Sequence, residues 1–260
     1  MKRTFRDQIG KAVALASTPK RIVSIVPSQT ELLSALGLEN EVVGITKFCV
    51  HPESWFRTKK RVGGTKKINL KTVAGLKPDL ILANKEENTL EDIAALEEIA
   101  PVWTSDIRDM DGALAMIRAV GTLVGKEHRA NEIAQEIESQ FASIAPSAKH
   151  KRILYIIWKD PYMAAGRDTF IQSMLRSAGF ENAIQDPHSR YPALSVEEIK
   201  EINPEKLLLS SEPFPFKRKH TEEVRETFPG IEVQEVDGEL FSWYGSRMLK
   251  SAIYFKSLQS

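Results

Sequence analysis

Short apolar runs alternate along the chain with segments in which apolar residues recur every three or four positions. The runs are rich in β-branched residues, which is typical of buried parallel strands. The segments between them have the spacing of helices that bury one face. The predicted strands are 21–26, 42–45, 79–83, 101–103 and 152–157, and the predicted helices are 70–76, 91–100, 111–124 and 127–145. This alternation indicates an α/β fold.

A further helix is predicted directly after the first strand. Pro27 ends that strand, and Gly37 closes the helix after it. Either Ser28 or Thr30 can cap its start, because a hydroxyl oxygen accepts a hydrogen bond from a free backbone N–H.

The segment from Glu127 to Ala145 contains neither proline nor glycine and is followed by Pro146. Its apolar residues form one stripe at helical spacing, namely Ala130, Ile133, Ala134, Ile137, Phe141 and Ile144. At 1.5 Å per residue such a helix spans about 28 Å, roughly the width of a small lobe. The segment therefore suits a connection between two lobes.

After this helix the pattern starts again. The run 152–157 is similar to 21–26, and the segment 178–182 is similar to 36–40. Setting Pro204 on Pro78, an offset of 126 residues (204 − 78), aligns the flanking apolar positions as well. Three matches in the same order indicate two related α/β lobes.

We therefore predict two Rossmann-like α/β lobes joined by a single long backbone helix, with a ligand cleft between the lobes. The N-terminal lobe is expected to cover residues 1–125, the connecting helix 126–146 and the C-terminal lobe 147–260.

Ligands of parallel α/β sheets bind at the carboxyl ends of the strands, so the loops after the predicted strands are the candidate site. These loops carry many Lys and Arg residues, several Glu residues and a set of aromatic residues. Aromatic walls with converging charges suit a planar or bulky polar ligand with anionic groups. Because the three rings of Phe241, Trp243 and Tyr244 are hard to bury together, we expect this cluster to face the ligand. For any other single ring, burial in a core is an equal alternative.

Composition narrows the classes of protein. The 260 residues include 36 Lys+Arg and 35 Asp+Glu, for a net charge of +1, which argues against a strongly basic nucleic-acid-binding protein. Cys49 is the only cysteine, which excludes an internal disulfide framework and a multi-cysteine metal site. None of the motifs GxxxxGK[ST], GxGxxG, GxSxG and HExxH occurs, and we interpret the segment 63–67 as a turn.

The five histidines are scattered and show no set of three or four metal ligands. His51, His188 and His220 lie in loops of the candidate site. His51 is the first candidate for an axial ligand to a metal already held by a chelate. Solvation or a hydrogen bond is the commoner fate of a loop histidine. No firm metal site is predicted.

The N-terminus begins with basic residues, as a signal peptide does, but Arg6, Asp7 and Gln8 then interrupt the place where its apolar core would lie. The nearby apolar run 12–16 is shorter than the roughly 7–15 residues of a signal peptide core. As written, the sequence therefore predicts a cytoplasmic protein, and a periplasmic one if a native leader is missing.

Several motifs together resemble a known family. They are Asp7–Val13, Pro19–Val23, Ser24–Glu31, the Leu-x-Pro-Asp-Leu-Ile pattern at 76–81, and Tyr191–Glu198 in the second half. The chain resembles the helical-backbone (class III) substrate-binding proteins of ABC importers for cobalamin, iron-siderophores and haem. It is most similar to the cobalamin-binding branch. The resemblance implies two rigid lobes with modest hinge motion and a ligand held without chemistry.

Two departures from the family pattern concern partner and ligand. The family docks on its permease through one surface glutamate per lobe, and the internal repeat places these positions at Lys71 and Glu197. Lys71 would repel a permease arginine. Phe48 and Tyr191 match aromatic cleft positions of cobalamin binders, whereas Lys66 and Asn84 stand where tryptophan is expected. The resemblance therefore does not carry over the identity of the ligand.

We predict a non-enzymatic, monomeric binding protein without an intrinsic cofactor that captures a cobalamin-like or siderophore-like metal chelate for import through an ABC permease. The predicted ligand-binding residues are Phe48, His51, Lys66, Asn84, Lys85, Glu87, Trp158, Arg167, Tyr191, Glu212, Trp243, Tyr244 and Arg247. Two alternatives stay open. One is a cytoplasmic carrier or sensor on the same fold, and the other is a cofactor-modifying enzyme with His51, Cys49 or Glu212 as acid or base.

Overall fold

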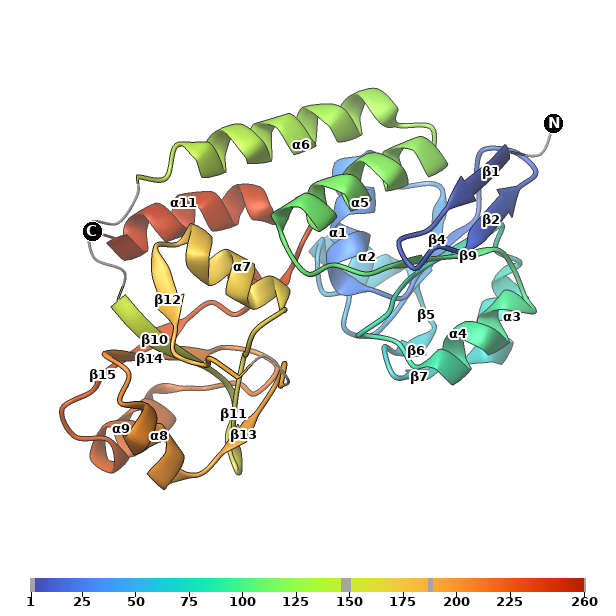
Figure 1. Ribbon diagram of the computed structural model, residues 1–260. Helices are drawn as coiled ribbons and strands as arrows, with labels where there is room; N and C mark the ends of the chain where they lie inside the picture. Colours follow the sequence, from blue (N-terminus) through green and yellow to red (C-terminus); the bar gives the residue numbers. More distant parts are fainter. Residues whose placement is uncertain (1–2, 146–150, 187–188, 260) are drawn as a thin grey trace. The chain divides into compact units, whose positions relative to one another are not determined.

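The computed structural model of the chain describes residues 3–145, 151–186 and 189–259. The chain divides into two compact units, which are seen in Figure 1. Unit 1 comprises Met1–Ile107, Asp111–Glu136 and Tyr244–Arg247, and unit 2 comprises Arg108–Met110, Ile137–Trp243 and Met248–Ser260. His188 and the predicted boundary at residue 146 lie outside the described residues. The predicted division into segments 1–125, 126–146 and 147–260 stays a prediction.

Unit 1 is built on a five-stranded sheet in which all neighbouring strands are parallel, in the order β5-β4-β3-β8-β9. Its strands are β3 (Ile22–Ser24), β4 (Val42–Ile45), β5 (Lys60–Arg61), β8 (Leu80–Asn84) and β9 (Val102–Ser105). Its helices are α1 (Pro27–Ala35), α2 (Glu53–Thr58), α3 (Leu70–Leu76), α4 (Leu90–Glu97) and α5 (Met110–Leu123). Two small antiparallel hairpins complete it, β1 (Arg3–Arg6) with β2 (Ala12–Leu15), and β6 (Gly63–Gly64) with β7 (Lys67–Ile68).

Unit 2 is built on a mixed sheet in the order β13-β11-β10-β14-β15, with β12 paired to β10. Its strands are β10 (Lys151–Trp158), β11 (Tyr162–Ala164), β12 (Phe180–Asn182), β13 (Ala193–Leu194), β14 (Lys206–Ser210) and β15 (Glu232–Val236). Its helices are α7 (Phe170–Ser177), α8 (Val196–Ile202), α9 (Arg218–Thr227), α10 (Glu239–Ser242) and α11 (Met248–Gln259). Strand β11 pairs antiparallel with β10 and with β13, and the other pairings in this sheet are parallel. The predicted α/β class is confirmed.

The central strands explain why the apolar runs were continuous rather than alternating. Every residue of β8 is buried, and so is every residue of β14. A parallel strand covered on both faces has no solvent side, so polar positions are lost from its sequence. Lys206 of β14 is buried as well, and its ammonium lies 2.8 Å from the carboxylate of Glu232.

The internal repeat is visible in the structure at the offset of 126 residues. Helix α3 and strand β8 span 70–76 and 80–84, and α8 and β14 span 196–202 and 206–210. Both helices end on a left-handed residue, Lys77 (φ 47°) in unit 1 and Asn203 (φ 47°) in unit 2. Each unit also has an arginine that donates to the last carbonyls of its helix, Arg21 to Leu76 and Arg152 to Ile202. The predicted relation between the two halves therefore extends to cap geometry.

The predicted cap of the first helix is wrong. Helix α1 begins at Pro27, and Val26 precedes it without a side-chain cap. Proline has no N–H to satisfy at the first helical position, so a hydroxyl cap is not needed there. Thr30 instead donates from its hydroxyl to the carbonyl of Val26 and to Ser24, both buried.

The long helix α6 (Glu127–Ala142) forms as predicted on its apolar stripe, but it ends three residues before Ala145. Ala130, Ile133, Ala134 and Ile137 are fully buried. Ile144 N–H donates to Phe141, which is a tightened three-residue turn rather than a continuing helix. The boundary between the two units falls within α6, between Glu136 and Ile137. None of the described helices combines the length and apolar character needed to cross a membrane.

Candidate functional site

The segments that follow β4 and β5 of unit 1, at the carboxyl ends of these strands, line a hollow of about 870 Å³. We call it the basic pocket and define it by Lys47, Phe48, the hairpin residues Gly63–Ile68, Asn69 and Leu70. It brings together two predicted ligand-binding residues, Phe48 and Lys66. Lys47 and Lys67 lie beside them and were not among the predicted site residues. Both could have been predicted from their place in the sequence, because each is the immediate neighbour of a predicted site residue in the same loop.

Asn84, another predicted site residue, is not among the residues that define this pocket. Its side chain is buried and donates to Ser105, while its oxygen accepts from the backbone N–H of Glu86 at 2.8 Å and of Glu87 at 3.1 Å. Asn84 therefore shapes the turn after β8. Nearby, Asn88 donates to the carbonyl of Thr65 at 2.8 Å and ties this turn to the β6–β7 hairpin.

Two charged residues after β8 have partners within unit 1. Lys85 forms an ion pair with Asp106 at 2.8 Å. The hydroxyl of Tyr244 donates to the carboxylate of Glu87 at 3.2 Å. Burial raises the pKa of Tyr244 well above its ordinary value, and the charge of Glu87 adds to this rise. Tyr244 is therefore a hydrogen-bond donor to Glu87 that holds the segment Tyr244–Arg247 in unit 1.

Arg247 is held in the same way. Its guanidinium makes two hydrogen bonds to the carboxylate of Glu31, from Nε at 2.7 Å and from Nη2 at 3.0 Å. The two side chains are 6% and 15% exposed. Such a paired, buried arginine anchors the chain, and this contact competes with the ligand contact predicted for Arg247.

Cys49 and His51 differ sharply in accessibility. Cys49 is fully buried, and its Sγ lies 3.1 Å from the hydroxyls of Thr30 and Thr46. Burial raises the pKa of the Cys49 thiol, which disfavours the reactive thiolate. His51 is partly exposed and precedes the cis peptide bond to Pro52. Within residues 3–145, 151–186 and 189–259, no three His, Cys, Asp or Glu side chains are grouped to hold a metal ion.

Unit 2 presents two half-exposed aromatic residues from the predicted set. Trp158, at the end of β10, is 40% exposed and packs edge-on against Phe214 with ring centroids 5.6 Å apart. Tyr191 is 37% exposed, and the guanidinium of Arg190 lies 6.0 Å from its ring centroid. Arg167 is exposed and lines a separate hollow of about 450 Å³.

Glu212 follows β14 and lines an acidic hollow of about 540 Å³ together with Glu235, Asp237 and Glu239. Its carboxylate accepts from the indole N–H of Trp243 at 3.0 Å and from the hydroxyl of Ser242. Burial raises the pKa of Glu212, and the neighbouring acidic groups raise it further.

The expectation that Phe241, Trp243 and Tyr244 form an exposed cluster is wrong. They are 0%, 8% and 6% exposed. They are buried because the structure separates them: Phe241 packs against Tyr155 and Phe255 of unit 2, Trp243 donates to Glu212, and Tyr244 belongs to unit 1.

A change at Glu212 should alter how stability depends on pH. Because its folded pKa is raised, folding retains a proton that the unfolded chain releases near pH 4.5, so stability is lost as pH rises through the folded pKa. Glu212→Gln keeps an acceptor for Trp243 without this loss, which amounts to about 1.4 kcal/mol per unit of pKa difference. Urea unfolding at pH 4.5 and 7.5 should show a smaller fall for E212Q than for the unchanged protein. The exposed Glu226→Gln is the control, and equal falls in all three proteins would contradict the assignment.

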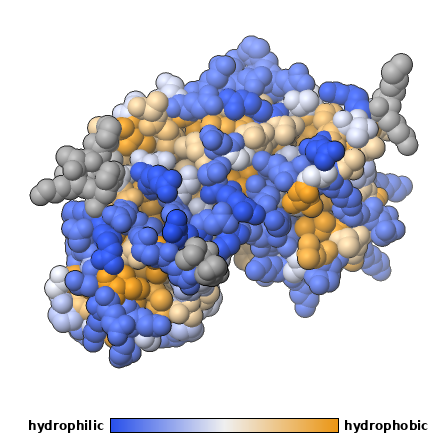
Figure 2. All heavy atoms as spheres, in the orientation of Figure 1, coloured by the Kyte–Doolittle hydropathy of each residue, from blue (hydrophilic) through white to orange (hydrophobic). Residues whose placement is uncertain are grey.

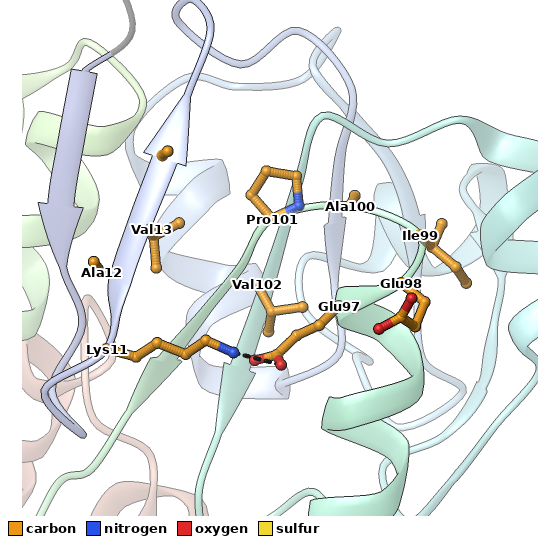
Figure 3. Close-up of a pocket in the computed structure, with 10 residues that line it drawn as sticks. Lys11, Ala12, Val13, Glu97, Glu98, Ile99, Ala100, Pro101 and Val102 are labelled. Atoms are coloured by element: carbon orange, nitrogen blue, oxygen red, sulfur yellow. Dashed lines mark ion pairs between the residues drawn. The ribbon is translucent and has the colours of Figure 1, made fainter.

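Another hollow, of about 320 Å³, lies at the outer edge of unit 1 between β2 and the α4–β9 connection (Figure 3). Lys11 and Glu97 form an ion pair there. The segment Ala100–Val102 on its wall precedes and begins β9, so the hollow is at the amino end of that strand. Because ligands of parallel sheets bind at the opposite ends of strands, we assign this hollow to packing of the β1–β2 hairpin.

Comparison with known proteins gives a family. The sequence pattern of the periplasmic binding protein family matches residues 22–230. An ABC transporter substrate-binding lipoprotein of Bacillus subtilis, YvrC, is 28% identical over 216 residues, which are 79% of this chain and 68% of that protein. A cobalamin-binding protein of Halobacterium salinarum is 30% identical over 211 residues, which are 78% of this chain. The matched region spans only 57% of the length of the Halobacterium protein.

Solved structures share the fold across nearly the whole chain. The petrobactin-binding protein YclQ of Bacillus subtilis superposes with a TM-score of 0.83 at 21% identity and covers 100% of this chain and 99% of its own. The vitamin B12-binding protein BtuF of Vibrio cholerae gives 0.73 at 19% identity and covers 93% and 98%. At such identities the likeness concerns the fold alone. With the match over residues 22–230, the chain belongs to the periplasmic binding protein family.

Proposed function

We propose that the chain is the substrate-binding component of an ABC importer and that it captures a metal chelate, cobalamin-like or siderophore-like, as cargo. The cobalamin-binding protein of Halobacterium salinarum, a relative by sequence, supports this, and the petrobactin-binding protein YclQ shares the fold. The bound chelate is cargo rather than an intrinsic cofactor. The chain acts as a monomer, without nucleic-acid partners.

One observation carries the proposal: large aromatic side chains stay exposed at the loops where ligands of this fold class bind. Hydrophilic residues cover most of the face seen in Figure 2. The exposed large hydrophobic residues nevertheless include Phe48, Trp158 and Tyr191, all predicted ligand contacts. An accessible aromatic ring offers a flat apolar surface on which a bulky ligand can stack.

Binding is measured directly by a visible-absorption titration of the purified protein. Aquocobalamin, haemin, a ferric hydroxamate and a ferric catecholate each absorb visible light and respond to a change of surroundings. We expect a saturating change at one equivalent with at least one of them, and weaker binding in Phe48→Ala. Absence of binding to all four would remove the metal-chelate function.

The state of the residues considered for acid or base chemistry supports a non-enzymatic role. Of the three groups considered for acid or base chemistry, Cys49 is fully buried and Glu212 accepts hydrogen bonds from Trp243 and Ser242. His51 is partly exposed and stays a candidate axial ligand of a bound chelate. Binding without turnover in the titration above distinguishes a carrier of cargo from a cofactor-modifying enzyme.

The proposed permease contacts occupy the same structural position in the two units. Lys71 and Glu197 are the second residues of α3 and α8, and both are exposed. A carboxylate is favoured at a helix N-terminus and an ammonium is not, so Lys71 has no local structural benefit there. Lys71 is compatible with a permease that has an acidic residue opposite α3. It is also compatible with the alternative function, a cytoplasmic carrier that docks on no permease. Fractionation of the native cells separates the two, because a purely cytosolic protein would exclude import.

Glu197→Ala should reduce the ligand-dependent stimulation of the cognate permease ATPase about five-fold, since removal of a rim charge mainly weakens association. Glu201→Ala, on the same helix and also exposed, is the matched control. Equal stimulation by both variants would argue against docking through α8.

A further inference from the structure

The basic pocket has a backbone that is preformed for a ligand. The N–H of Lys47 donates to the carbonyl of Gly63 at 2.8 Å, and the hairpin tip is held by Asn88 through the carbonyl of Thr65. Gly63 has φ +112°, and a Cβ there would lie 2.5 Å from the carbonyl oxygen of Lys67. The hairpin therefore needs glycine at this position to bring its lysines beside Phe48.

Gly64 has a second, different role in the pocket. A Cβ at this position would lie 3.2 Å from Cε2 of Phe48. Without that carbon the Phe48 ring lies against the hairpin backbone while about half of its surface, 49%, remains exposed. One edge of the ring is therefore close to the hairpin, and about half of the side chain stays accessible to a stacking partner.

The charge of the pocket is strongly one-sided. Lys47, Lys66 and Lys67 line it, and none of the three ammonium groups has a carboxylate partner among the residues that the structure describes. Some other lysines of unit 1 do have one, since Lys59 pairs with Glu39 and Lys85 with Asp106. Three uncompensated positive charges in one hollow attract an anion and disfavour a cationic ligand.

The Phe48 ring and the positive charge of Lys47 are close enough to contact the same chemical group of a ligand. The ammonium of Lys47 lies 5.0 Å from the centroid of the Phe48 ring, so a ligand that contacts the ring also meets this charge. A planar ring with anionic oxygens at its edge, such as a catecholate or an aryl carboxylate, satisfies both features. A corrinoid, whose only anionic group is one phosphodiester, would leave most of the charge unmatched.

We propose, resting on the function proposed above, that the basic pocket binds an anionic aromatic group of a ferric chelate. Phe48 contacts the ring, and Lys47, Lys66 and Lys67 surround the oxygens. The chain thereby selects polyanionic catecholate-type ferric chelates over corrinoids and over cationic hydroxamates.

The test compares three probes by intrinsic tryptophan fluorescence or calorimetry: a ferric tris-catecholate, a cationic ferric hydroxamate and aquocobalamin. Each is titrated at 50 mM and 500 mM NaCl against the unchanged protein, Lys66→Gln, the triple variant K47Q/K66Q/K67Q and the control Lys126→Gln. Lys126 is an exposed lysine of unit 1 outside the pocket. The substituted lysines of the pocket are at the surface, and circular dichroism checks that each variant is folded.

We expect the catecholate to bind most tightly, with an affinity that falls about ten-fold between the two salt concentrations. K66Q should bind it about three-fold to ten-fold more weakly, and the triple variant at least about thirty-fold more weakly, whereas K126Q should match the unchanged protein. Aquocobalamin or the hydroxamate binding more tightly than the catecholate would overturn this assignment and leave the proposed function intact. Catecholate binding that ignores salt and all three lysines would also overturn it. No binding of any probe would remove the proposed function itself, and this inference with it.

Discussion

Replacing Arg247 with methionine should lower the free energy of unfolding by about 3–5 kcal/mol, the largest effect of a single substitution that we expect in this protein. The guanidinium makes two hydrogen bonds to Glu31, and both side chains are largely buried. The carboxylate of Glu31 loses its contact with water on folding, and the hydrogen bonds from Arg247 compensate for that loss. Without Arg247 this compensation is removed. Guanidinium chloride unfolding followed by far-UV circular dichroism measures the loss.

The double variant Glu31→Met with Arg247→Met distinguishes two contributions to the loss of stability. One is the net contribution of the ion pair, and the other is the cost of a buried Glu31 carboxylate without Arg247. A buried pair replaced by apolar residues of similar volume is often neutral or stabilising, so the double variant should be markedly more stable than R247M alone. A double variant as unstable as R247M would mean that the stranded charge of Glu31 is not the cause. A loss below about 1 kcal/mol in R247M would mean that the pair behaves as a surface pair.

Gly121→Ala should destabilise unit 1 by about 1–3 kcal/mol, although alanine is the better helix former. Gly121 lies in α5, and a Cβ there would come 2.2 Å from the Cβ of Ala130 in α6. Both residues are in unit 1 and are buried, so neither helix can accommodate the added carbon without shifting. Denaturant unfolding of the purified variant measures the cost.

Gly75→Ala is the matched control for this prediction. Gly75 lies in α3, and a Cβ there meets no heavy atom within 4 Å. Its replacement should therefore stabilise the protein by about 0.5–1 kcal/mol through helix propensity alone. The contrast in sign between the two variants is the result that matters. Equal gains in both would show that α5 and α6 are not closely packed at Gly121.

The fold could be predicted from the sequence where the signal is local. Strand β4 has the predicted bounds, and β8 differs from its prediction by one residue at each end. Such runs are readable because a strand buried on both faces excludes polar residues from neighbouring positions. Helix α6 was readable from one apolar stripe, while its end at Ala142 depends on a turn that no stripe encodes. The repeat was readable because Pro78 and Pro204, with the apolar residues around them, recur at one offset.

The candidate site was predictable only in part. Phe48, Trp158 and Tyr191 were predicted as ligand contacts, with burial in a core as the alternative for each ring, and each is more than a third exposed. Asn84 was also placed after a strand, but its amide already makes hydrogen bonds to Ser105 and to the backbone N–H of Glu86. A position in a loop after a strand indicates that a side chain is near the site. It does not indicate whether that side chain already makes hydrogen bonds to the backbone, which leaves it unavailable to a ligand.

The sequence by itself determined the α/β class, the doubling of the fold and the basic, aromatic character of the loops, because each arises from residues close together in the chain. Only the tertiary structure determined where the segment Tyr244–Arg247 lies and which residues its side chains bind. Arg247 pairs with a residue 216 positions away, and Tyr244 with one 157 positions away. No periodicity records such contacts, since they depend on how the chain returns to unit 1 and on which buried charge finds a partner there.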